Sequence, residues 1–244
     1  MRGFIARPAP PRLDRSRIDP RPAMLGNDTL GDCTAAGIGN HLHATAALAG
    51  FCIGVDTSDA VRFYARSTGY VPGDPATDGG GVEVDVLTTA LRDGYALADQ
   101  TLFPLWGSAD PSDLNGVRNI TAGLSAAYLG VQLAQADMWE DEAGNLSPVW
   151  DTHGPPGHGD PTPGSAGGHC LLLWDYVGTD DTDLVTLLTW GTTQKATWRW
   201  VRSRIMEAHG LAWRQLHAPG SLYPVGDDWA ALVAANDAYL AGTG

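Results

Sequence analysis

The sequence has few cysteines, few basic residues and no long apolar run, and each shortage removes a class of protein. Three cysteines in 244 residues cannot form a complete set of disulfides, and their spacing fits no zinc site. No stretch approaches the roughly 20 apolar residues of a membrane-spanning helix, so we expect no membrane insertion. Only 15 Lys and Arg oppose 28 Asp and Glu, and the net charge of −13 disfavours nucleic acid as a partner.

Targeting signals and cofactor motifs are also missing. The first residues contain no apolar segment like that of a signal peptide, so we expect a protein that is cytoplasmic or carried in a particle. His153, His158 and His169 match no metal-ligand spacing, and we expect neither a metal nor another cofactor. The hydrophobic content of 43% is typical of a globular chain, and we find no interdomain linker and no internal repeat.

Residues 1–22 differ in composition from residues 23–244. The first segment holds six arginines against two aspartates, so its charge is near +4 and that of the remainder near −17. Its five prolines disfavour a helix and favour an extended path. We therefore predict an extended basic arm on a domain of residues 23–244. The arm either wraps over its own acidic domain or docks a protein partner.

Cys33 stands at the start of a predicted helix, residues 34–49, whose small and apolar side chains indicate burial on most sides. Asp32 is a natural N-cap, and a helix start favours the thiolate form of a cysteine. The amide of Asn27, six residues upstream, can reach the same space as the Cys33 N–H. Two such donors beside a nucleophile make an oxyanion hole, so this segment is a candidate catalytic turn.

His169 is the candidate base that a cysteine nucleophile needs. It follows a glycine turn and opens a predicted apolar strand that runs to residue 176, and a second strand covers residues 184–190. Pairing these strands around the polar turn between them brings Thr189 and Trp190 back near His169. We expect Trp190 to shield the contact between the cysteine and the histidine.

The order of these motifs resembles that of the papain-like cysteine peptidases. Four short motifs follow one another in the family order between residues 27 and 200: Asn27 with Gly31 and Cys33, then Gly80-Gly81, then Gly168-His169, then Trp190-Gly191. In that family a glutamine six residues before the nucleophile donates to the oxyanion, and Asn27 holds its position. The resemblance implies an α+β fold in which an N-terminal helical half packs on an antiparallel sheet, with a cleft between the halves.

The resemblance also implies roles for single residues. Cys33 would attack an amide carbonyl, His169 would transfer the proton, and Asn27 would stabilise the oxyanion. The implied substrate-binding positions are Gly80, Gly81 and Trp190. The chain departs from the family at Leu188, which replaces the asparagine that orients the histidine. We predict that Thr189 orients the ring instead or that the dyad works unaided.

Hydrophobic periodicity and capping residues predict the remaining elements. Predicted helices cover residues 59–67, 82–93, 111–123, 197–208 and 229–241, and further strands cover residues 124–135 and 211–216. Residues 69–81, 97–107 and 138–166 are predicted loops, of which the first and the last are candidate walls of the cleft. The histidines at positions 41 and 43 are predicted to be packed in the core, and Cys52 and Cys170 to be small buried side chains.

Two functions remain open on the sequence. The first is a cysteine hydrolase that cleaves a peptide or a peptidoglycan amide through a Cys-His dyad, similar to short microbial and phage-borne members of the family. The second is a catalytically silent papain-like subunit of a phage or secreted particle, which Leu188 and the basic arm favour. The presence of Cys33, His169 and Asn27 together favours catalysis.

Overall fold

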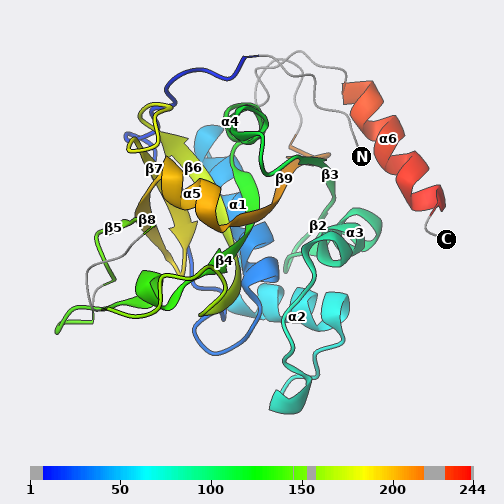
Figure 1. The fold of residues 1–244 in the computed structure, drawn as a ribbon. Coiled ribbons are helices and arrows are strands. Elements are labelled where there is room, and N and C mark those ends of the chain that lie inside the picture. Colours follow the sequence, from blue (N-terminus) through cyan, green and yellow to red (C-terminus); the bar gives the residue numbers. More distant parts are fainter. Residues whose placement is uncertain (1–7, 145, 153–157, 217–228, 243–244) are drawn as a thin grey trace.

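Helices occupy most of the N-terminal half of the chain and strands most of the C-terminal half (Figure 1). The computed structural model describes residues 8–144, 146–152, 158–216 and 229–242. The helices are α1 (Cys33–Leu48), α2 (Thr57–Thr68), α3 (Glu83–Asp93), α4 (Leu114–Gly123), α5 (Trp198–Arg204) and α6 (Trp229–Gly242), with 3-10 turns η1 (Pro75–Thr77) and η2 (Gln135–Met138). Within these described ranges, no helix is both long and apolar enough to cross a bilayer.

The main sheet has seven strands in the order β3-β9-β4-β6-β7-β8-β5. These strands are β3 (Pro104–Ala109), β4 (Ala127–Leu133), β5 (Val149–Trp150), β6 (Gly167–Tyr176), β7 (Leu184–Thr189), β8 (Thr192–Thr197) and β9 (Ile205–Trp213), and β1 (Tyr95–Ala96) pairs with β2 (Thr101–Leu102) apart from them. All neighbours in the main sheet are antiparallel except β5 and β8, which are parallel. The predicted α+β class with an antiparallel-rich sheet is confirmed.

Helix α1 is the central helix, and it packs against β6 of the sheet (Figure 1). Its composition of alanine, glycine and a few aliphatic residues leaves no polar face, and almost every residue up to Ala46 is buried. Gly37 is the point of closest approach, because a Cβ there would lie 2.9 Å from both the Cys170 sulfur and the Tyr128 ring. A side chain at this position would push the helix off the sheet.

The sheet separates two apolar cores, as strand alternation requires. Leu172 and Trp174 of β6 face the core shared with α1, α2 and α3. Leu171 and Leu173 of the same strand face the second core, which α4 and α5 cover with residues such as Val117 and Trp200. Both faces of β6 are therefore buried, which explains its almost continuous run of apolar residues.

The predictions were wrong for the segment after β8 and for two strands. Residues 197–208 were expected to form one helix, but α5 ends at Arg204 and β9 begins at Ile205. The last six residues of β9 are all buried, so no alternation marks the strand. Strand β3 was predicted to be part of a loop, because its first residue is Pro104. Proline is tolerated at the first position of an edge strand, and β3 is an edge strand. Strand β8 was missed altogether.

The C-terminal helix α6 protects the edge of the sheet at β3. The Asn236 side chain accepts from the Trp106 backbone N–H at 3.1 Å and donates to the Trp106 carbonyl, also at 3.1 Å. These are the two hydrogen bonds that a neighbouring strand would make with Trp106. One amide side chain thus replaces a missing strand at this residue.

The described part of the N-terminal segment, residues 8–22, runs along the body of the protein. Leu13 forms a bridge with Tyr176, in which both backbone N–H groups donate to the opposite carbonyls. The buried Arg15 guanidinium donates to the carbonyls of Thr121, Trp174 and Ser125. Burial lowers the pKa of Arg15 to about 10. This arginine is therefore held by backbone oxygens and not by an ion pair with the acidic surface.

Candidate active site

Cys33 is the first residue of α1 and lines a cleft of about 740 Å³ between the helical half and the sheet. Asn27, Gly80, Gly81 and His169 line the same cleft. The structure thus brings together the predicted nucleophile, base, amide donor and glycine wall. Trp190 is not among the residues that line the cleft, since it lies behind the imidazole.

The Cys33 thiol is held in its neutral form. Burial is the main reason that its pKa is raised to about 11, and the carboxylates of Glu83 and Asp32 raise it further. The backbone N–H of Cys170 acts in the opposite direction, because it stabilises the thiolate. The expectation that the helix start favours a thiolate is therefore outweighed in this conformation by desolvation and by nearby negative charge.

Asp32 is a buried acid directly before the nucleophile. Its side chain makes no capping hydrogen bond, and both carboxylate oxygens are buried; among the described residues only the Asn27 side chain comes near enough to stabilise the charge. Burial raises the pKa of Asp32 to about 7, with additional repulsion from Asp78 and Asp28. A Cβ on Gly26 would lie 2.9 Å from one Asp32 oxygen, so the glycine leaves room for the carboxyl group.

His169 is held from two sides. Its Nε2 lies 2.7 Å from the Thr189 hydroxyl, and its ring stacks on Trp190 with centroids 4.3 Å apart and planes 21° from parallel. Thr189 faces the histidine because Leu188 points to the opposite side of β7, into the core, where it is 2% exposed. Burial lowers the pKa of His169 to about 4, so the imidazole is neutral at neutral pH.

The dyad is open in this conformation. In the part of the chain that the structure describes, no hydrogen bond joins the Cys33 sulfur to the His169 ring. Asn27 is half-buried at the cleft and donates its side-chain N–H to the Leu30 carbonyl at 3.2 Å. The expected close contact of sulfur and imidazole, and the expected role of Asn27 at an oxyanion, remain predictions.

Asp78 joins the turn before the nucleophile to the neighbouring segment that contains Gly80. Both of its carboxylate oxygens accept from the Gly31 backbone N–H at 3.1 Å. The Tyr64 hydroxyl donates to Asp78 at 2.6 Å and accepts from the Gly80 backbone N–H at 2.9 Å. Sequence analysis placed Asp78 in a glycine-rich loop without a role, because its partners are distant in the chain.

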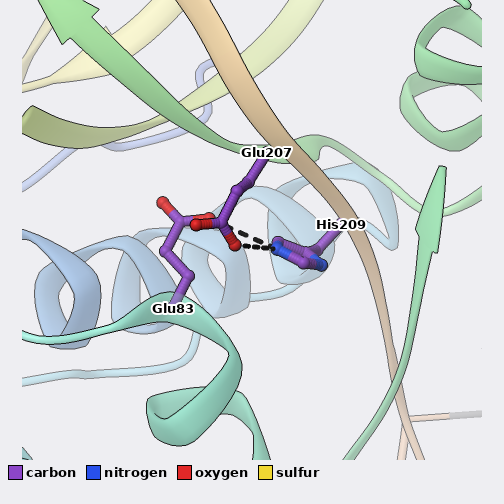
Figure 2. Close-up of side chains that lie close together, drawn as sticks. All are labelled: Glu83, Glu207 and His209. Atoms are coloured by element: carbon purple, nitrogen blue, oxygen red, sulfur yellow. Dashed lines mark hydrogen bonds and ion pairs between the residues drawn. The ribbon is translucent and has the colours of Figure 1, made fainter. Parts of the chain in front are cut away.

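A second group of polar side chains lies in the cleft and was also missed. Glu83 begins α3, and Glu207 and His209 belong to β9 (Figure 2). Both glutamates line the cleft. The spacing of Glu207 and His209 would place them on one face of a strand, but the predicted helix over residues 197–208 concealed that pattern.

The remaining histidines lie elsewhere. His41 is a core residue, which donates from Nε2 to the Leu124 carbonyl and accepts at Nδ1 from the Trp213 indole. Burial lowers the pKa of His41 to about 4. His158 packs its ring against Trp139, with centroids 4.4 Å apart, and His153 lies outside the described residues. The expected core position of His41 is confirmed.

Comparisons with known proteins rest on structure alone, since no protein-family model and no curated protein sequence matches this chain. The chain is similar to xylellain, a cysteine protease from Xylella fastidiosa, with 12% identity and a TM-score of 0.53 over 83% of this chain and 86% of that chain. It is also similar to digestive procathepsin L 3 of the Tenebrio molitor larval midgut, with 13% identity and a TM-score of 0.52 over 86% of this chain and 73% of that chain. At this identity the likeness establishes the fold, which is that of the papain-like cysteine proteases.

Proposed function

We propose that this protein, which has the fold of papain-like cysteine proteases, is a cysteine hydrolase that cleaves an amide bond of a peptide or of peptidoglycan. The observation that carries the proposal is the position of Cys33 at the start of a buried helix, in one cleft with a histidine held by Thr189 and Trp190. A cysteine, a base and a group that orients the base are the parts that nucleophilic acyl transfer needs.

Each residue has a defined part in the proposed reaction. The Cys33 sulfur attacks the carbonyl carbon while its proton passes to His169, and the C–N bond then breaks as the leaving amine takes that proton. Water next attacks the thioester with His169 as its base, which releases the carboxylic acid and restores the Cys33 thiol. Donation from Nε2 to the Thr189 hydroxyl leaves Nδ1 as the basic nitrogen of the ring. The Asn27 amide and the Cys33 N–H would stabilise the oxyanion, provided that Asn27 exchanges its bond to Leu30 for one to the substrate.

The glycine walls support an extended substrate. Gly80 and Gly81 line one side of the cleft, and Gly167 and Gly168 line the other. A Cβ on Gly167 or Gly168 would meet no atom within 4 Å, so these residues leave their backbone open to the cleft. Open backbone on the wall formed by Gly167 and Gly168 suits a peptide chain that forms backbone hydrogen bonds with the protein.

The neutral dyad favours a second candidate function. Proton transfer from a thiol of pKa about 11 to an imidazole of pKa about 4 is strongly uphill in this conformation. A papain-like subunit without catalysis, whose N-terminal segment of residues 1–22 docks a protein partner through exposed arginines such as Arg12 and Arg17, would not need this transfer. Catalysis requires that substrate binding or closure of the cleft brings sulfur and imidazole together.

Labelling of the thiols distinguishes the two functions. We expect a peptidyl epoxide to modify Cys33 at neutral pH, with His169→Ala abolishing the reaction, and hydrolysis of peptide or muropeptide substrates to be lost in Cys33→Ala. Cys52, which was predicted to be buried but is exposed, lies outside the cleft and is the internal reference thiol. If the epoxide modifies Cys52 as fast as Cys33 and no substrate is hydrolysed, the protein is a non-catalytic member of its fold.

A further inference from the structure

We propose that Glu83, Glu207 and His209 form a binding site for a divalent transition metal, with zinc as the best-fitting ion, in the wall of the cleft. The site goes beyond the proposed hydrolase activity and does not depend on it. Figure 2 shows the Glu83 side chain approaching from the start of α3, and those of Glu207 and His209 from neighbouring positions of β9. The carboxylates of Glu83 and Glu207 lie at the same edge of the His209 imidazole ring.

The distances between the three groups suit tetrahedral coordination. The His209 Nε2 atom lies 3.1 Å from a Glu207 oxygen and 3.5 Å from a Glu83 oxygen, and one ligand atom of each residue lies within 4.8 Å of the others. Zinc bonds of about 2.0–2.1 Å place the ligands of a tetrahedron about 3.3 Å apart. The two distances to His209 lie on either side of that value.

Glu83 gives a second observation that points to a cation at this place. Its side chain is 7% exposed, and the oxygen that lies 3.5 Å from His209 Nε2 is buried and accepts no hydrogen bond from the described residues. A Cβ on Gly130 would lie 3.0–3.2 Å from the Glu83 carboxylate atoms, so the glycine makes room for the group at this place. A buried carboxylate that faces a second carboxylate is costly unless a positive charge lies between them.

His209 is oriented as metal-binding histidines are. Its Nδ1 lies 2.9 Å from the Ser108 hydroxyl, and the ring meets the edge of Trp106 with centroids 5.6 Å apart. These contacts hold the imidazole so that Nε2 points toward the two carboxylates. When Nδ1 donates its proton to Ser108, Nε2 presents a lone pair to the ion.

The kind of ligand selects the kind of metal. One imidazole nitrogen and two carboxylates suit zinc and similar transition ions, whereas calcium needs six to eight oxygen ligands. Three protein ligands leave one position of a tetrahedron for a water molecule or a substrate group. Because Glu83 and Glu207 line the cleft, that open position faces the space a substrate would occupy.

Zinc titration of the full chain tests the site. The protein carries Cys33→Ala and Cys52→Ala, so that neither thiol can bind the ion, and the readouts are calorimetry and the absorption spectrum of bound Co²⁺. We expect one ion per chain and a tetrahedral Co²⁺ spectrum without thiolate bands. Since Cys33 is absent, a failure here says nothing about the proposed hydrolase, and a failure of the hydrolase says nothing about the metal.

Matched variants locate the ion. We expect Glu207→Gln and His209→Asn each to weaken zinc binding at least about tenfold, because each removes a ligand, and Ser108→Ala to weaken it less. Glu142→Gln removes the same charge from an exposed loop and should leave binding unchanged. The Glu207 side chain is 41% exposed, so its variant should fold even if His209→Asn does not.

Two results would overturn the proposal. One is the absence of saturable zinc binding, or binding that Glu207→Gln weakens no more than Glu142→Gln does. The other is a cleft that binds an arginine-containing peptide through Glu207 but does not bind zinc. The two carboxylates would in that case receive a cationic side chain.

Discussion

Among single residues, Thr189 makes the contact that orients the candidate base, and its hydroxyl can be removed without changing its shape. We expect Thr189→Val to slow labelling of Cys33 by a peptidyl epoxide roughly fivefold, since a hydrogen bond contributes about 1 kcal/mol. Thr189→Ser keeps the hydroxyl and should react like the wild type. If the valine variant also reacts at the wild-type rate, another group orients His169 or none does.

Asp32 links the stability of the fold to pH. Its pKa is about 7 in the folded protein against an ordinary value of 3.8, so the unfolded chain loses the proton first as pH rises. The free energy of unfolding therefore falls between these two pH values. Asp32→Asn cannot ionise, so we expect it to be more stable than the wild type at pH 8, by about 2–4 kcal/mol, and similar to it at pH 3.

Urea unfolding at both pH values tests this expectation, with the exposed Asp99→Asn as the control, because Asp99 does not contribute to the raised pKa of Asp32. The same Asp32→Asn variant should lower the pKa of Cys33, because one of the charges that raise it is gone. A pH profile of Cys33 alkylation measures that change. If the difference in the free energy of unfolding between Asp32→Asn and the wild type is the same at pH 3 and at pH 8, Asp32 titrates normally in the folded protein.

At the scale of elements, Asp78 joins the turn before α1 to α2 and to the glycine wall. Asp78→Ala removes the acceptor of the Gly31 N–H and of the Tyr64 hydroxyl. We expect a loss of about 2–3 kcal/mol in the free energy of unfolding and slower labelling of Cys33. Asp74→Ala alters the cap of η1 in the same loop and should cost about 1 kcal/mol without affecting the labelling. Equal labelling rates in the two variants would contradict a positioning role for Asp78.

The elements that could be predicted are those whose local pattern agrees with their surroundings. The small-residue run after Asp32 and the apolar run after His169 gave α1 and β6 with nearly correct bounds. Only the end of β9 was predicted, as part of a strand over residues 211–216, and its first residues were assigned to the helix predicted over residues 197–208. The last six residues of β9 are all buried, so no period of two residues marks where the strand begins. Asp78 was predicted to lie in a loop that forms a wall of the cleft, but neither its partner Gly31 nor the position of Glu83 in the cleft could be predicted, since the groups that these two acids face are far away in sequence.

For the whole molecule, Arg15 is the anchor of the N-terminal segment. Arg15→Met leaves three buried carbonyls without their donor, so we expect a loss of about 3 kcal/mol in the free energy of unfolding. Arg12→Met removes a solvent-exposed arginine that is paired only with Asp14 and should change stability by less than about 0.5 kcal/mol. Urea unfolding measures both values, and limited proteolysis before residue 22 shows whether the segment detaches. Equal stability of the two variants would show that Arg15 does not anchor the segment.

The pairing of β3 with β9 has a consequence for the growing chain. Pro104 pairs with Trp213, so about 100 more residues must be synthesised after β3 before the strand next to it is complete. At roughly 5–20 residues per second, the ribosome leaves this strand unpaired for about 5–20 seconds. Asn236, which closes the outer edge, emerges later still. The nascent protein thus keeps β3 apart from the rest of its sheet until synthesis is nearly finished, and chaperones would have that interval in which to bind.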